Sequence, residues 1–309
     1  MPVPHVSGNF GDLVDPRVTK LFYETYDQLP DVLPQLFNKQ SSSDQYETVS
    51  GVGGFQDFSP FTGTVSYQAQ NQGYDVRATH LEFASGFQIE RALYDDDRHN
   101  IWQGKPRALA TAAQRTRQKH GARLLNNAFS IDTMFYNHSE GVALCSNSHT
   151  TTYGNVSTAT GFDNLTTASL SLTALTAAKK QMMQFLDEAG NRISLMPNEL
   201  WIPVDLLDVA DEIVNSSGKP DTANNNINVM KGALSIEPSS NGWNYLTDTN
   251  NWFICDGDMR KQNAVWYDRV SLEFAQAEDI DTLVAKWRAY MRYSFMWYDW
   301  RWMLGAQVS

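Results

Sequence analysis

The sequence predicts an α+β fold, in which strand-like and helix-like segments follow one another along a chain of 309 residues. Residues 65–79 and 287–297 alternate apolar and polar side chains, which is the period of half-buried strands. Residues 109–128 and 172–185 instead repeat apolar side chains every three or four positions, as one face of a helix does. A chain of this length buries roughly three quarters of its unfolded surface if it folds compactly, so a large core is expected.

The first 46 residues predict an arm, because they contain only two short apolar segments. Asp15 and Pro16 are typical of a helix start, and apolar residues follow at helical spacing as far as Tyr26. A second apolar patch occupies residues 32–37. An apolar helix of this kind either marks an interaction site or packs on its own chain, and the sequence leaves both alternatives open.

A β-hairpin is predicted after this arm. Two runs of apolar residues alternate with polar ones, the first at Val65, Tyr67 and Ala69 and the second at Tyr74, Val76 and Ala78. Between them, Asn71, Gln72 and Gly73 predict a turn. The apolar phase changes near residues 78–80, which predicts a bulge or a bend there.

The predicted hairpin needs a surface to lie on, because an isolated two-stranded ribbon is marginally stable in water. That surface is either the core of the same chain or a neighbouring molecule. Gly51, Gly53 and Gly54 precede the hairpin and predict hinges at its base.

A basic amphipathic helix is predicted from the next segment, since residues 98–130 contain seven basic residues and no acidic one. Arg115, Lys119 and Arg123 fall on one helical face, opposite an apolar face. Such a stripe contacts DNA or an acidic surface of another molecule, or it is simply a solvated face. The sequence does not decide between these alternatives.

Residues 164–217 predict a helix, a turn, a buried strand and a second helix. Ser171 is a candidate N-cap for the first helix, and Gly190 suits the turn that ends it. The strand is the apolar run between Pro197 and Pro203, and helical spacing resumes from Asp205. No catalytic motif interrupts this segment.

The C-terminal segment is the richest in aromatic residues. Trp287 to Trp297 alternate as a strand with one aromatic face, and the phase reverses around Asp299 and Arg301. Aromatic residues interleaved with arginine can stack on nucleic-acid bases. A core strand, with Asp299 paired locally to an arginine, is the favoured interpretation.

Composition excludes several classes of protein. The net charge of −11 opposes DNA binding by the chain as a whole, and only 19% of its residues are charged. No run of about 18 apolar residues predicts a membrane span, and the first residues lack a signal-peptide pattern. The two cysteines, Cys145 and Cys255, are too few for a disulfide framework.

Motifs for catalysis are absent from the sequence. It contains no G-x-x-x-x-G-K-[ST], no H-E-x-x-H and no G-x-S-x-G. Asp95, Asp96 and Asp97 could bind a divalent metal ion, although acidic residues at a helix start more often complement its dipole. Cys145 and His149 lack the second pair that a zinc site needs. No enzyme activity and no cofactor are therefore expected.

The order of short motifs resembles the phage Mu family of major head subunits. The resemblance rests on Asp187–Gly190 (DEAG), Pro197–Pro203 (PNELWIP) and the D-L-x-x-x-A pattern that begins at Asp205. Two further segments support it, the ALCSNSH of residues 143–149 and the stretch from Phe83 to Asp97. It extends over most of residues 45–305.

This resemblance implies a major capsid protein with the Hong Kong 97-like fold. The expected parts are an N-terminal arm (1–46), an extended E-loop hairpin (47–92), a spine helix with the first part of a peripheral domain (93–160), an axial domain (161–262) and the C-terminal strands of the peripheral domain (263–309). It also implies that the E-loop contacts another subunit, through Tyr67, Asn71, Gly73, Tyr74 and Arg77.

The function implied is self-assembly as hexamers and pentamers into an icosahedral shell around packaged double-stranded DNA. Expected partners are other copies of the chain, portal, scaffolding and decoration proteins, and DNA through weak non-specific contact, with no membrane partner. The expected location is the virion, assembled in the bacterial cytoplasm. Two alternatives stay open, a decoration or tail protein and a metal-dependent enzyme using Asp95, Asp96 and Asp97.

Overall fold

The computed structural model describes residues 16–65, 67–90, 101–152, 162–219, 226–279 and 284–308. In this part of the chain, helices and strands are mixed, and the strands form three sheets. The sheet with the longest strands, which we call the long sheet, has the order β1-β10-β11-β4. Its strands are Asn38–Ser41, Ala264–Asp279, Val284–Trp297 and Leu81–Glu90. Strand β1 is parallel to β10, and the other neighbours are antiparallel.

The alternation predicted for the C-terminal strand is confirmed by β11. Its odd-numbered residues from Trp287 to Trp297 are buried, whereas Lys286 and Arg288 are exposed on the other face. The aromatic residues therefore form the core, and the interpretation as a base-stacking surface is wrong for this strand. Phe295 and Tyr293 pack against Trp266 on the neighbouring strand β10.

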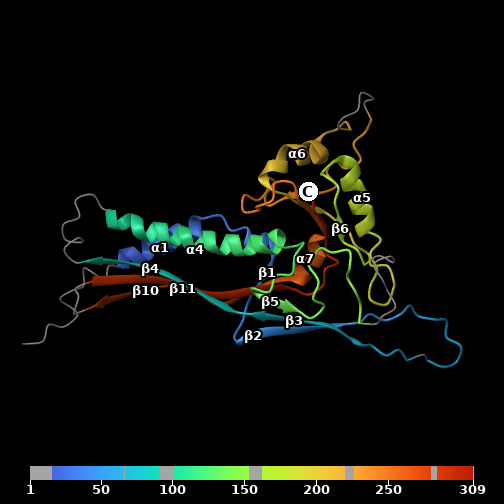
Figure 1. Cartoon of the computed structure of the whole chain (residues 1–309), viewed down its shortest axis with the longest axis horizontal. Helices are drawn as coiled ribbons and strands as arrows, with labels where there is room; N and C mark the ends of the chain where they lie inside the picture. Colours follow the sequence, from blue (N-terminus) through green and yellow to red (C-terminus); the bar gives the residue numbers. More distant parts are fainter. Residues whose placement is uncertain are drawn as a thin grey trace, which may run out of the picture.

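Two helices cover the buried face of the long sheet (Figure 1). The predicted long helix is confirmed as α4 (Ile101–Asn126), and α1 (Pro16–Gln28) lies beside it. Phe22 of α1 packs with Leu109 of α4 and Ala289 of β11 in one apolar cluster. The hydroxyl of Tyr23 also accepts a hydrogen bond from the backbone of Phe274, close to a bulge in β10.

The described N-terminal residues pack on their own chain. Phe22 of α1 is fully buried, and helix α2 (Leu33–Leu36) buries both of its leucines. Phe37 then contacts Trp266 and Phe295 before β1 joins the edge of the sheet. Of the two alternatives for these apolar segments, the structure therefore shows packing within the chain.

The second sheet contains the ribbon that the sequence predicted only in part. Strand β2 (Tyr46–Val52) pairs with β3 (Gln72–Thr79), and β3 also pairs with β5 (Tyr136–His138). The predicted strand at residues 65–69 is wrong, because the described residues of 53–71 carry no regular structure. The predicted turn at Asn71–Gly73 is wrong too, since Gln72 and Gly73 lie inside β3. The alternation of apolar and polar residues from residue 65 onward did not indicate a buried face, because Val65 and Tyr67 are both exposed.

The phase change near residues 78–80 marks a change of sheet, which confirms the predicted bend. Strand β3 ends at Thr79 in the second sheet, and β4 begins at Leu81 in the first. His80 lies between them and is buried, with Nδ1 2.8 Å from Ser294 Oγ and Nε2 3.1 Å from Ser42 Oγ. The bend is therefore held by hydrogen bonds to both neighbouring segments.

The third sheet has the order β6-β12-β9-β7-β8, with strands Leu165–Thr166, Met303–Ala306, Trp252–Cys255, Glu199–Trp201 and Ser235–Glu237. Helices α5 (Leu172–Met182) and α6 (Leu207–Asn215), the latter preceded by a 3-10 turn at Val204–Leu206, lie near it (Figure 1). The short helix α7 (Gly257–Asn263) links β9 to β10. Strand β12 has no counterpart in the sequence analysis, because it is only four residues long.

The order of helix, turn, strand and helix predicted for residues 164–217 is confirmed, although the first helix ends at Met182 and not at the turn that contains Gly190. The Ser171 side chain accepts a hydrogen bond from the backbone of Ala174, as an N-cap does. Gly190 has φ +87°, the left-handed conformation that glycine adopts without strain. Leu200 and Trp201 of β7 are fully buried, so this strand lies in the core.

Candidate assembly surface

The ribbon of β2 and β3 projects beyond the body of the molecule, and residues 53–71 continue it as a long loop (Figure 1). We call this segment the 53–71 loop and describe all of it except residue 66. The ribbon is attached where Val76 and Ala78 of β3 are buried and pair with β5. The far end of the ribbon therefore has no core of its own beneath it.

Large apolar side chains of the loop face solvent. Phe58 is 96% exposed, Tyr67 94% and Phe61 74%. Exposure of one such side chain costs roughly 1.5–3 kcal/mol relative to burial, and clustered exposure is typical of an interaction site. Tyr67 is among the residues predicted from the sequence to contact another subunit, whereas the phenylalanines are not, although their spacing of three within a glycine- and proline-containing stretch was a readable signal.

The base of the loop is tied to the turn after α5. Gln56 Nε2 donates to the carbonyl oxygen of Ala189 at 2.9 Å, and Asn191 Nδ2 donates to the carbonyl oxygen of Phe55 at 3.2 Å. The backbone N–H of Gly53 also donates to the carbonyl oxygen of Asn71 at 3.0 Å. These contacts fix the direction in which the loop leaves the ribbon.

Two of the glycines lie where the strands come closest. A Cβ atom on Gly73 would lie 3.2 Å from the carbonyl carbon of Gly51, and one on Gly51 would lie 3.3 Å from the carbonyl oxygen of Tyr74. Gly54 lies against the Asp187 carboxylate. Among the described residues, the glycines with positive φ do not include Gly51, Gly53 or Gly54. Their hinge role stays a prediction.

The other residues predicted to contact a second subunit are engaged within the chain. The Tyr74 hydroxyl lies 2.6 Å from the Thr150 hydroxyl, and the Arg77 guanidinium lies 3.8 Å from the centre of the Tyr46 ring. Asn71 and Gly73 belong to the base of the loop. Tyr67 alone of the five predicted residues presents a large, almost fully exposed side chain.

A cavity of about 230 Å³ lies at this base, between β2 and the C-terminal turn. Glu188 lines it beside Asp299 and Arg301, and burial raises the pKa of the Glu188 carboxyl. Arg301 forms the predicted local pair with Asp299, at 2.9 Å, and donates to the carbonyl oxygen of Leu186. The turn that contains Asp299 and Arg301 therefore supports the segment after α5, to which the base of the loop is hydrogen-bonded.

The predicted basic stripe on α4 is only partly available. Arg115 and Lys119 are exposed, but Arg123 makes a bidentate pair with Asp132, at 2.6 and 2.9 Å. Burial raises the pKa of Asp132, but hydrogen bonds from Arg123, Asn127 and the Met134 backbone outweigh this effect and hold it below its ordinary value. Arg123 is therefore structural, and two cations of the stripe face outward.

The remaining candidates for chemistry give no site in the described residues. His149 Nδ1 lies 3.0 Å from Glu140 Oε1, and its ring stacks on Trp300, so this histidine belongs to the core. Burial raises the pKa of the Cys145 thiol far above its ordinary value. No group of metal-binding side chains occurs among the residues that the structure describes, and Asp95, Asp96 and Asp97 lie outside them.

Comparison with protein families supplies the deciding observation. The model of a family described as phage capsid protein matches residues 73–305, well over half of the chain. The chain belongs to this phage capsid protein family. The capsid protein is thus a virion component with a structural role. A comparison with curated proteins found no match.

Solved capsid structures share the fold of this capsid protein. The mature capsid of bacteriophage PhiM1 aligns with a TM-score of 0.58 and 8% identity, over 91% of this chain and 88% of that one. The capsid of cyanophage P-SCSP1u gives 0.55 at 11% identity, over 91% and 88%. The native GTA particle gives 0.55 at 11% identity, over 91% of both chains.

These matches establish the Hong Kong 97-like fold that the sequence predicted. The resemblance to phage capsid proteins is confirmed at the level of the family, and the narrower likeness to the phage Mu head subunits stays a prediction. Within the described residues, no helix of the capsid protein has the length and apolar character of a membrane span.

Proposed function

We propose that this chain is the major capsid protein of a tailed phage and that it assembles as hexamers and pentamers into an icosahedral shell. The observation that carries the proposal is the 53–71 loop, whose aromatic side chains are exposed beyond the body of a chain that has the capsid fold. Association of subunits would bury these side chains and so supply a driving force for assembly.

The expected division of the chain gives each part a mechanical role. Residues 1–46 would form the N-terminal arm, and residues 47–92 would carry the E-loop. Residues 93–160 would provide the spine helix and the first part of the peripheral domain, which the strands of residues 263–309 would complete. Residues 161–262 would meet copies of themselves around the capsomer axis. A decoration or tail protein is the weaker candidate, because α4 and the sheet below it have the form of a capsid subunit.

Packaged double-stranded DNA would touch the inner surface only weakly. The chain carries a net charge of −11, which disfavours strong phosphate binding, and the outward-facing cations Arg115 and Lys119 offer a limited local attraction. Weak contact would let the genome move during packaging. Portal, scaffolding and decoration proteins are the further expected partners, and assembly is expected in the host cytoplasm.

Electron microscopy of the purified full chain tests the proposal, with sedimentation to measure particle mass. We expect regular shells, or rings of five and six subunits, when the chain is concentrated alone or with its scaffolding protein. A chain that stays monomeric under every assembly condition, scaffold included, would contradict the proposal.

A further inference from the structure

A cavity of about 200 Å³ lies where three distant parts of the chain meet. Gln114, Arg115 and Gln118 of α4 line one side, residues 29–32 before α2 line another, and residues 243–245 of the loop between β8 and β9 complete it. We call it the Trp243 cavity. A cavity of about 150 Å³ is large enough to bind benzene, so this one has room for a molecule of about six to nine non-hydrogen atoms.

Two buried polar atoms of the lining residues have no hydrogen-bond partner within the described chain. One is Nε1 of Trp243, a donor, and the other is Oε1 of Gln118, an acceptor. These two residues are only 2% and 3% exposed. Gln118 Nε2 donates to Asp31 Oδ1 at 2.8 Å, and this contact identifies Oε1 as the atom without a partner. Native proteins leave few buried polar atoms unpaired, so this pair calls for a partner from outside the chain.

The charge beside these two atoms is positive. Arg115 lines the cavity, its side chain is exposed, and no ion pair joins it to another of the described residues. None of the described residues that line the cavity is acidic. The acid closest to the pair is Asp31, on Gln118, and Lys39 Nζ lies 2.9 Å from its carboxylate and balances its charge. The Trp243 cavity therefore favours an anion over a cation.

Together, the three groups match one kind of small molecule. Carboxylate oxygens accept hydrogen bonds, so they suit the Trp243 N–H and the Arg115 guanidinium. Gln118 Oε1 needs a donor, and a hydroxyl or ammonium group on the carbon next to the carboxylate supplies one. We propose that the Trp243 cavity binds a small 2-hydroxy or 2-amino acid. This site is separate from the 53–71 loop and does not depend on assembly of the chain.

A ligand in this cavity joins α4 to the loop between β8 and β9. Asn126 at the end of α4 already links the two, because its Nδ2 donates to the carbonyl oxygen of Tyr245 at 3.0 Å and its Oδ1 accepts from the backbone N–H of Thr247 at 3.0 Å. A bound acid adds contacts across the same junction. Its binding should therefore slow amide hydrogen exchange in residues 243–247 of the free subunit.

Ligand-detected NMR on the unassembled full-length subunit tests the proposal. The probes are L-lactate and L-alanine, which carry the hydroxyl and the ammonium donor respectively. Propionate lacks this donor, and lactamide lacks the carboxylate. We expect saturable binding of lactate or alanine below about 10 mM, and the comparison of the two identifies the preferred donor. Propionate and lactamide should bind at least about tenfold more weakly, because each leaves one group of the site unpaired.

Two results with these probes would overturn the inference. If neither lactate nor alanine binds, the two buried atoms are satisfied by ordered water only. If propionate binds as tightly as lactate and alanine, Gln118 does not select the ligand. Shell formation is measured separately, so either result leaves the proposed function intact.

Variants of the lining residues place the binding at this cavity. Arg115→Gln should weaken binding of the preferred probe at least about tenfold, since it removes the positive charge. Lys119→Gln is the matched control, because Lys119 is also exposed on α4 but does not line the cavity, and it should bind as the wild type does. Trp243→Phe keeps an aromatic ring without the N–H and should weaken binding to a similar extent.

Folding of each variant is checked by its melting temperature. Arg115 is exposed, so Arg115→Gln should fold normally and keeps the test valid even if the buried Trp243→Phe does not fold. Wild-type affinity in Arg115→Gln, or in a folded Trp243→Phe, would overturn the proposed site.

Discussion

Arg117 of α4 lies 3.0 Å from the Asp268 carboxylate of β10, and this buried ion pair joins the long helix to the sheet. The Arg117 side chain is only 4% exposed, and its guanidinium lies 5.3 Å from the centre of the Trp266 ring. Trp266 donates its own indole N–H to the same carboxylate. The helix is therefore positioned on the sheet by charge as well as by apolar packing.

Removal of one partner of this pair should destabilise the subunit strongly. Arg117→Met leaves the Asp268 carboxylate without its partner, and breaking a buried pair in this way costs about 3–5 kcal/mol. Denaturant unfolding of the unassembled subunit measures the change. The double variant Arg117→Met with Asp268→Leu is the control, and it should recover part of the loss. A single variant as stable as the wild type would contradict the role of the pair.

A methyl group at Gly86 should also destabilise the subunit. A Cβ atom there would overlap the Trp287 carbonyl oxygen on the paired strand β11, so Gly86→Ala should cost roughly 1–3 kcal/mol through overpacking. Gly104 in α4 has no atom near the equivalent position, so Gly104→Ala should be neutral or stabilising. Thermal unfolding of both variants checks the prediction, and equal melting temperatures would argue against it.

Mild acid should destabilise the subunit through His120. Burial, with a smaller effect from Arg123, lowers the pKa of His120 to about 4 from an ordinary value of 6.5. Between these values the unfolded chain binds more protons than the folded one, so stability falls as the pH is lowered through this window. With solvent screening, the loss should be roughly 1–2 kcal/mol.

His120→Gln tests this effect in unfolding measurements from pH 7 to about 4. The variant should lose less stability than the wild type over the same range. Some dependence should remain, because burial also lowers the pKa of His80 and His138. Identical pH profiles for variant and wild type would show that His120 is not the responsible group.

Reversal of the outward-facing cations tests the role of the basic stripe. Arg115→Glu with Lys119→Glu should change folding stability by less than about 0.5 kcal/mol, because both side chains are exposed. If the stripe contacts DNA or an acidic neighbour, the yield of filled particles should fall. Lys231→Glu with Lys261→Glu makes the same change in net charge elsewhere on the surface. Normal packaging in both variants would leave the stripe as a solvated face.

The sequence predicted best those elements whose apolar residues become the core. Alternation in β11 and helical spacing in α4 and α5 correspond to buried faces, so their patterns carried the information directly. The turn residues of 187–190 were equally readable, because Gly190 needs a left-handed conformation. Patterns of this kind depend on residues that are close in the sequence, so they can be recognised without knowledge of the tertiary structure.

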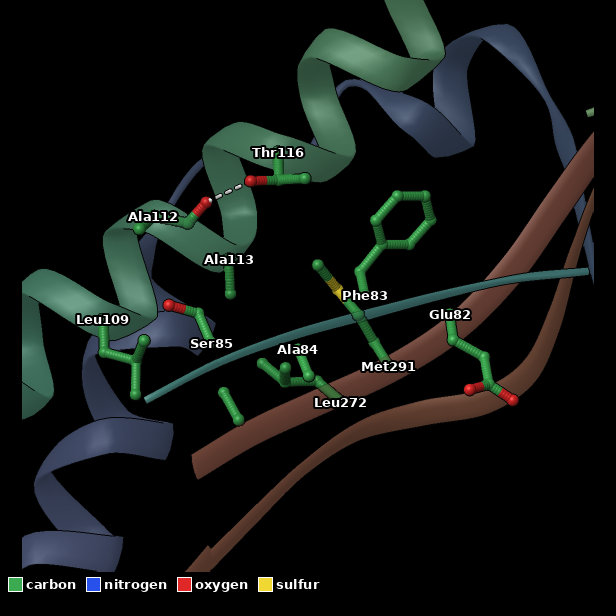
Figure 2. A pocket seen from close by; sticks show the side chains of 11 residues that line it. Glu82, Phe83, Ala84, Ser85, Leu109, Ala112, Ala113, Thr116, Leu272 and Met291 are labelled. Carbon is green, nitrogen blue, oxygen red and sulfur yellow. Dashed lines mark hydrogen bonds between the residues drawn. The ribbon is translucent and has the colours of Figure 1, made fainter. Parts of the chain in front are cut away.

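The sequence predicted the wrong partner strand for this ribbon, because no local pattern of residues shows that β2 pairs with β3. Apolar and polar residues alternate between Val65 and Ala69, but the described residues of this segment lie in an irregular loop, while β2 pairs with β3 across a gap of about twenty residues. Strand β1 is polar at all four positions and is stabilised by pairing with β10. The cavity of about 340 Å³ between α4 and the sheet (Figure 2) was unpredictable for a related reason, since α4, β4, β10 and β11 meet there from distant parts of the chain.

Cryo-electron microscopy of assembled particles would show directly whether and how the subunits associate. We expect closed shells built from rings of five and six subunits, with the 53–71 loop of each subunit lying on its neighbour. Particles in which this loop folds back on its own subunit would contradict the assembly surface. A chain that never leaves the monomeric state, even with its scaffolding protein, would contradict the proposed function itself.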